Sequence, residues 1–102
     1  MELILTGDFM NANEALQRGL VSRVVKTENT LNEAIEVAHK ISKYSQIAVI
    51  KCKDAVNASY ETSLSQGLSY EKRLFWATFA TEDQKIGMNA FASKKIPEFK
   101  NK

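Results

Sequence analysis

Four helix-start signatures recur along this chain and restrict what it can fold into. Each has Ser, Thr or Asn followed three residues later by Glu or Gln, as in Asn11/Glu14, Thr30/Glu33, Ser63/Gln66 and Thr81/Gln84. In such a capping box the first side chain accepts a hydrogen bond from the amide of the fourth residue, and the fourth side chain bonds back. The signatures therefore predict helices that begin near residues 11, 30, 63 and 81.

Apolar periodicity supports the same reading. After Thr30, apolar side chains follow at i, i+3, i+4, i+7 and i+10, which marks one face of a helix: Leu31, Ala34, Ile35, Ala38 and Ile41. Further helices are predicted over residues 1–6 and from Ser45, and the last one must end before Pro97. Residues 21–25 are long enough only for an edge strand or an extended connector. The sequence therefore predicts an all-α chain of five or six helices with almost no sheet.

Composition and charge exclude several classes of protein. The 102 residues are 44% hydrophobic and 25% charged, which indicates one globular domain, or part of one, rather than a disordered segment. The net charge is +2, and residues 94–102 carry four Lys against one Glu. A short basic stretch without a base-reading element does not predict nucleic-acid binding. No apolar run approaches the 18 residues of a membrane helix, so no membrane partner is predicted.

The residues alone predict no catalytic site and no metal site. His39 is the only histidine and Cys52 the only cysteine, so neither an internal disulfide nor a thiol cluster for a metal can form. For His39 we expect a structural or solvent-facing role. For Cys52 we expect a buried or half-buried thiol, because the flanking Lys51 and Lys53 point to other faces of the predicted helix.

Aromatic side chains crowd the helix predicted after Ser63: Tyr70, Phe75, Trp76 and Phe79. Two interpretations stay open. The cluster is either the core of a small helical domain or a surface that another part of a larger protein, or another subunit, covers. A single helical layer cannot easily cover all of these rings, so we expect some of them to face a partner surface.

Several stretches of the chain resemble a known family. The runs Leu3-Ile-Leu-Thr-Gly-Asp8 and Ala15-Leu-Gln-Arg-Gly-Leu-Val-Ser22 resemble the C-terminal part of the enoyl-CoA hydratase (crotonase) family. The likeness continues through Lys53-Asp-Ala-Val-Asn-Ala58 and Thr78-Phe-Ala-Thr-Glu-Asp83, where it is greatest for the short-chain hydratases of mitochondria. It covers essentially the whole chain.

The resemblance implies a place in a larger fold. The chain would be the C-terminal helical (trimerisation) region of the crotonase ClpP-like α/β spiral fold, with the N-terminal ββα spiral absent. Residues 1–22 would end the core-linked segment, and residues 30–96 would form the trimerisation part. The implied partners are further copies of the same chain, in a homotrimer or a dimer of trimers.

The resemblance also implies an activity for the complete enzyme. Family members hydrate trans-2-enoyl-CoA to 3-hydroxyacyl-CoA in fatty-acid β-oxidation, in the mitochondrial matrix, or in the cytoplasm if the source is bacterial. Two catalytic glutamates and the oxyanion hole lie in the N-terminal part, so we expect no catalytic residue here and an inactive isolated chain, without a targeting peptide. No cofactor is implied, because the substrate itself carries coenzyme A. The alternative is a non-catalytic helical module for self-association or subunit docking.

The site residues that the resemblance implies are Phe75, Phe91 and Lys94. Matching positions in the family flank the adenine and the 3′-phosphate of coenzyme A, often on a neighbouring subunit. An aromatic face can stack on adenine, and a Lys ammonium acts as a point charge on phosphate. The alternative is that both phenylalanines belong to a core and that Lys94 is a solvated cation at a helix end.

Overall fold

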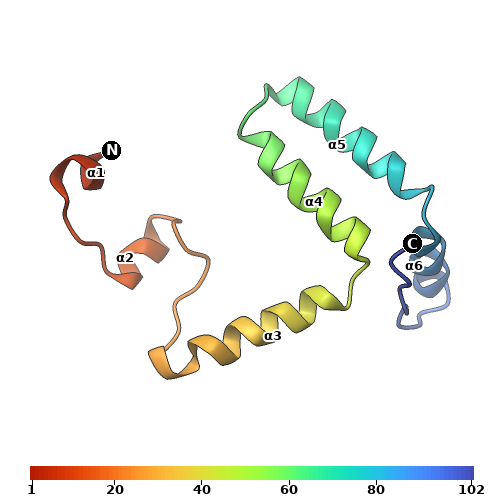
Figure 1. Ribbon diagram of the computed structural model, residues 1–102, viewed down its shortest axis with the longest axis horizontal. Helices are drawn as coiled ribbons and strands as arrows, with labels where there is room; N and C mark the ends of the chain where they lie inside the picture. Colours follow the sequence, from red (N-terminus) through yellow and green to blue (C-terminus); the bar gives the residue numbers. More distant parts are fainter. The chain divides into compact units, whose positions relative to one another are not determined.

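In the computed structural model, which describes all 102 residues, every regular element is helical. The chain order is α1 (Glu2–Thr6), α2 (Ala12–Gln17), the 3-10 turn η1 (Thr27–Asn29), α3 (Thr30–Ser42), α4 (Gln46–Ser59), α5 (Leu64–Thr78) and α6 (Glu82–Ala92), as Figure 1 shows. The predicted all-α class is confirmed. Residues 21–25 form the extended connector rather than an edge strand. None of the helices has the length and hydrophobicity needed to cross a membrane.

The chain forms two compact units, Met1–Glu36 and Val37–Lys102. In the first unit, both short helices end at a glycine with φ of +73°, Gly7 after α1 and Gly19 after α2. Around Gly19 the Gly19 amide donates to the Leu16 carbonyl at 3.1 Å and the Leu20 amide to the Ala15 carbonyl at 2.9 Å. This pair of bonds is a Schellman motif, which needs a left-handed residue and favours glycine there.

The start of α2 follows the predicted capping box only in part. The Asn11 side-chain oxygen accepts a hydrogen bond from the Glu14 amide at 2.9 Å, as predicted. The Glu14 carboxylate does not bond back, because it pairs with Arg18 one turn later at 2.7 Å. The cap therefore depends on Asn11 alone.

The capping box predicted at Thr30 is wrong. The turn η1 runs directly into α3, so Thr30 already has helical backbone angles (φ −57°, ψ −46°). Its hydroxyl donates to the Lys26 carbonyl at 3.4 Å instead of accepting from an amide. The Glu33 carboxylate is bound to Arg23 at 3.2 Å. An extra 3-10 turn replaces the side-chain cap at this helix start.

In the second unit, α4 and α5 lie side by side and run in opposite directions, and α6 follows at the end of α5 (Figure 1). Two predicted caps set the starts of α5 and α6. The Ser63 hydroxyl accepts from the Gln66 amide at 3.4 Å, and the Thr81 hydroxyl accepts from the Gln84 amide at 3.2 Å. These caps fix where the two helices begin.

Little apolar surface is buried within these residues. Ala15 and Ala90 are the only buried hydrophobic side chains. The accessible surface is 8993 Å², whereas a compact folded chain of this mass exposes about 5,800 Å². Large apolar side chains stay exposed in both units, including Leu5, Phe9, Leu31, Leu64, Trp76 and Ile96. Surface of this kind is typical of a segment that packs against other protein.

Candidate functional site

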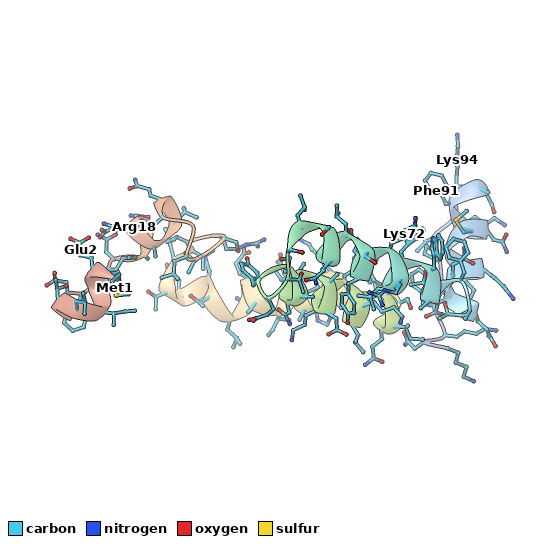
Figure 2. The ribbon with its side chains drawn as sticks, turned by 90° about the horizontal axis from the view of Figure 1, so that it is seen from above. Met1, Glu2, Arg18, Lys72, Phe91 and Lys94 are labelled. Atoms are coloured by element: carbon cyan, nitrogen blue, oxygen red, sulfur yellow. The ribbon has the colours of Figure 1, made fainter.

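Phe91 and Lys94 lie together at the end of α6. Figure 2 shows both side chains leaving the same end of this helix. Phe91 is 86% exposed, and Lys94 is exposed directly after the helix. Phe91 belongs to the last turn of α6, and Lys94 follows in the left-handed turn after the helix. The structure therefore offers an aromatic face and a cation at the same helix end to a ligand outside the helix.

The backbone at Lys94 has an uncommon conformation. Lys94 has φ of +54°, in the left-handed region where glycine is usual. The Lys94 amide donates to the Phe91 carbonyl at 3.2 Å and the Lys95 amide to the Ala90 carbonyl at 2.9 Å, which is the same Schellman motif as at Gly19. A side chain in this conformation costs about 1–2 kcal/mol. The chain therefore keeps a cation at a position where glycine would relieve backbone strain.

Phe75 lies apart from that pair, on α5. Its ring makes an edge contact with Phe79, with centroids 5.4 Å apart and planes at 77°. Phe75 is 59% exposed, so within these residues neither Phe75 nor Phe91 is a core side chain. The structure thus brings two of the three expected residues together and leaves the third on another helix.

Phe75 and Phe79 help to line an open hollow between α4, α5 and α6. Its volume is about 600 Å³, and its apolar walls include Ile47, Leu74 and Met88. Trp76 follows Phe75 on α5, and the Lys72 ammonium lies over its ring, 5.0 Å from the ring centroid. Because Phe75, Trp76 and Phe79 are all more than half exposed, the aromatic cluster of α5 is not an enclosed core.

The two side chains with reactive groups, Cys52 and His39, do not belong to any cluster of functional groups. Cys52 is exposed on α4, so the prediction of a buried or half-buried thiol is wrong. The reason is that α4 packs mainly against α5, so much of its remaining surface, Cys52 included, stays exposed. His39 is exposed on α3, in keeping with the solvent-facing reading. No group of three or more His, Cys, Asp or Glu side chains is placed to hold a metal ion.

Asp83 is the feature of this region that sequence reasoning missed. It lies in the first turn of α6 and is only 2% exposed. Its Oδ1 accepts from the Lys100 amide at 2.7 Å, and its Oδ2 accepts from the Asn101 amide at 3.0 Å. Burial acts to raise the pKa of Asp83, but these bonds, one from the Ser45 side chain and the Lys100 charge together hold that pKa below its ordinary value.

The segment around Asn101 connects the starts of two helices. The Asn101 side-chain oxygen accepts from the Gln46 amide at 2.9 Å and so caps α4. The Lys102 carbonyl accepts from the Glu82 amide at 2.8 Å, at the start of α6. Ser45 stands at the N-cap position of α4, but its hydroxyl makes no capping bond. In the sequence, the only feature that pointed to this arrangement was Asp83 in the first turn of a helix with a predicted cap.

The profile of the family described as enoyl-CoA hydratase/isomerase matches residues 1–102. The chain is 53% identical over 102 residues to a probable mitochondrial enoyl-CoA hydratase of Dictyostelium discoideum, covering all of this chain and 37% of that protein. It is 46% identical over 101 residues to the mitochondrial enoyl-CoA hydratase of Pongo abelii, covering 99% of this chain and 35% of that protein. The chain thus spans well under half the length of these relatives.

Solved structures agree with the family match. An enoyl-CoA hydratase structure from Geobacillus kaustophilus superposes with a TM-score of 0.94 at 38% identity, over 99% of this chain and 39% of that one. The hydratase of Bacillus anthracis gives a TM-score of 0.92 at 37% identity, with the same coverage of both chains. The helical fold is shared with these proteins, and more than a third of the aligned residues are identical. The chain belongs to the enoyl-CoA hydratase/isomerase family.

Proposed function

We propose that this chain is the C-terminal helical segment of an enoyl-CoA hydratase, which adds water across the 2,3 double bond of trans-2-enoyl-CoA to give 3-hydroxyacyl-CoA. The observation that carries the proposal is 53% identity, over all 102 residues, to a protein named as a probable enoyl-CoA hydratase. A bacterial relative of the same name, from Rhizobium meliloti, is 52% identical over the same length. The reaction belongs to the complete subunit, in fatty-acid β-oxidation.

Within that enzyme, the segment supplies binding groups rather than catalytic ones. Phe91 stacks on the adenine of coenzyme A, Lys94 places its ammonium on the 3′-phosphate, and Phe75 flanks the same end of the ligand. The exposure of all three side chains supports these roles. The groups that activate water lie outside these 102 residues, so the isolated chain is inactive. No separate cofactor takes part, because coenzyme A arrives as part of the substrate.

The segment also joins subunits. The apolar side chains that stay exposed in both units support association into a homotrimer or a dimer of trimers. Some relatives are named as mitochondrial, and others come from bacteria. We place the complete enzyme in the mitochondrial matrix if its source is a eukaryote and in the cytoplasm if its source is bacterial.

A chimeric enzyme tests the activity. The part of the Dictyostelium discoideum relative that matches this chain is replaced by the 102 residues, and hydration of crotonyl-CoA is followed by loss of the enoyl thioester absorbance. We expect turnover within about tenfold of the intact relative, and none from the 102-residue chain alone. A folded, assembled chimera without turnover would contradict the hydratase proposal. Turnover by the pure 102-residue chain would contradict its predicted inactivity.

The second candidate function is a non-catalytic module for self-association or subunit docking. The observation that favours it is the small buried core beside the large exposed apolar side chains. Light scattering of the 102-residue chain tests this association module. A trimer that forms without the rest of the subunit supports an autonomous association module. A well-folded monomer would contradict it.

A further inference from the structure

Asp83 is where three parts of the second unit meet. Its carboxylate accepts from the Lys100 and Asn101 amides, and the Asn101 side chain in turn accepts from the Gln46 amide at the start of α4. The Asp83 carboxylate is only 2% exposed, so water cannot take the place of its hydrogen-bond donors. Each of these bonds therefore holds its donor in place. We call Asp83 together with residues 97–102 the clamp.

The clamp also holds the backbone of α6 directly. The Lys102 carbonyl accepts from the Glu82 amide at 2.8 Å and from the Asp83 amide at 3.3 Å. These are first-turn amides, which have no partner inside the helix. The Lys100 ammonium lies 3.6 Å from the Glu82 carboxylate on the outside of the same turn. The first turn of α6 is therefore bound through backbone and side chains at once.

A second contact holds α6 further along. A Cβ atom added at Gly87 would lie 3.5 Å from Cε1 of Phe99, which is ordinary van der Waals distance. The Phe99 ring therefore lies against the helix at a position without a side chain, about one turn after Asp83. Two separated contacts fix the direction of a helix, whereas one would leave it free to pivot.

We propose that the clamp sets the direction of α6 and thereby positions Phe91 and Lys94 for the phosphate end of coenzyme A, which makes Asp83 a positioning residue. The proposal rests on the proposed function. A helix of 11 residues is about 16 Å long, so a tilt of about 10° at its start moves its far end by about 3 Å. A displacement of this size removes a charged hydrogen bond, which needs a separation of roughly 2.7–2.9 Å.

The test uses the chimeric hydratase and two substrates, crotonyl-CoA and crotonyl-3′-dephospho-CoA. In the parent chimera, kcat/KM favours the phosphorylated substrate, and Lys94→Gln removes that preference. We expect Asp83→Asn to lower the preference at least threefold by raising KM for crotonyl-CoA, with kcat and the dephospho substrate unchanged. General damage to the fold would affect both substrates alike and leave the ratio unmoved. Glu61→Gln, which changes an exposed acid outside both the clamp and the ion pairs, is the matched control.

Each outcome has a separate meaning. A folded Asp83→Asn chimera with the parent's preference contradicts the positioning role, while the proposed function stands. A parent chimera that hydrates both substrates equally well contradicts the role of Lys94, and the positioning role fails with it. If Asp83→Asn does not fold, the milder Phe99→Leu removes the second contact and must lower the same ratio.

A measurement on the 102-residue chain itself tests the clamp without any substrate. Asp83→Ala removes both acceptor oxygens of the Lys100 and Asn101 amides, so we expect hydrogen exchange at both to rise at least tenfold. The same substitution should speed exchange in the first turn of α6 but not at α5. Unchanged exchange at Lys100 and Asn101 would contradict the clamp.

Discussion

At the scale of single residues, two side chains occupy positions that cost stability when considered alone. Lys94 takes a left-handed backbone conformation that favours glycine, and Asp83 places a charge where only 2% of it meets solvent. Asp83 is compensated by hydrogen bonds within the chain. Lys94 has no such compensation among these residues, and strain of this kind is concentrated at functional positions.

The strain at Lys94 is testable by substitution. Lys94→Gly removes the cost of a left-handed side chain, partly offset by the extra freedom of glycine in the unfolded chain, so we expect about 0.5–1 kcal/mol of added stability. Urea denaturation measures it. The same variant should lose the preference for the 3′-phosphate in the chimera. Lys95→Gly, at a neighbouring residue without a positive φ, is the control and should not stabilise.

The Asp83 carboxylate gives stability a defined pH dependence. Its pKa is lower in the folded chain than the ordinary value of 3.8, so the folded chain binds this proton less readily than the unfolded chain. The stabilisation is therefore present above about pH 4 and is lost as the pH falls through the folded pKa. The charges that face it are the Lys100 ammonium and, beyond that, the Glu82 carboxylate.

We expect the free energy of unfolding to fall more between pH 5 and pH 3 in the parent chain than in Asp83→Asn. The variant has no carboxylate to protonate at this position, so it is less stable at pH 5 and loses less on acidification. Urea titrations at the two pH values give both differences. Equal losses in parent and variant would show that Asp83 does not control acid stability.

At the scale of elements, helix starts differ in how much a local pattern can reveal. At Asn11, Ser63 and Thr81 the predicted bond from the amide three residues later to the cap side chain forms, because donor and acceptor are close in sequence. The return bond of the capping box is absent at all three helix starts. The cap of α4 comes from Asn101, 55 residues from the Gln46 amide that it accepts from. No local pattern contains that pairing, and the same is true of the bonds that the Lys100 and Asn101 amides donate to Asp83.

The starts of α3 and α6 allow a matched comparison. Thr81→Ala removes an acceptor for a first-turn amide, which costs about 1 kcal/mol of stability. Thr30→Ala removes a hydroxyl that donates at 3.4 Å on the surface and caps nothing, so we expect a smaller loss, under about 0.5 kcal/mol. Urea denaturation of both variants tests the difference. Equal losses would mean that Thr30 acts as a cap in solution.

The candidate site was predictable only through likeness to the family. Phe91 and Lys94 carry no signal by themselves, since an aromatic and a lysine three residues apart are common on helices. The structure adds that they share one exposed helix end and that Lys94 is strained. The left-handed turn at Lys94 was not predictable, because the sequence has no glycine at that position.

At the scale of the whole molecule, the balance of buried and exposed surface decides how the chain behaves. A chain of 102 residues with two buried hydrophobic side chains gains little from its own core. Its main reserve of hydrophobic stabilisation lies in the apolar side chains that remain exposed. Covering them contributes roughly 25 cal/mol for each Å² removed from water, so burial of about 1,000 Å² outweighs any single cap or ion pair in the chain.

We therefore expect folding and association of this chain to be coupled, because its large apolar side chains stay exposed. For an obligate assembly, the midpoint of thermal unfolding rises with protein concentration, because subunits that bind one another withdraw folded chains from the unfolding equilibrium. We expect the midpoint of the 102-residue chain to rise by several degrees over a hundredfold increase in concentration, by circular dichroism at 222 nm or an equivalent helix signal. Sedimentation at the same concentrations should show trimers replacing smaller species. A constant midpoint with a folded monomer throughout would contradict this expectation. It would mean that each unit is stable without covering exposed side chains such as Phe75, Trp76 and Phe91.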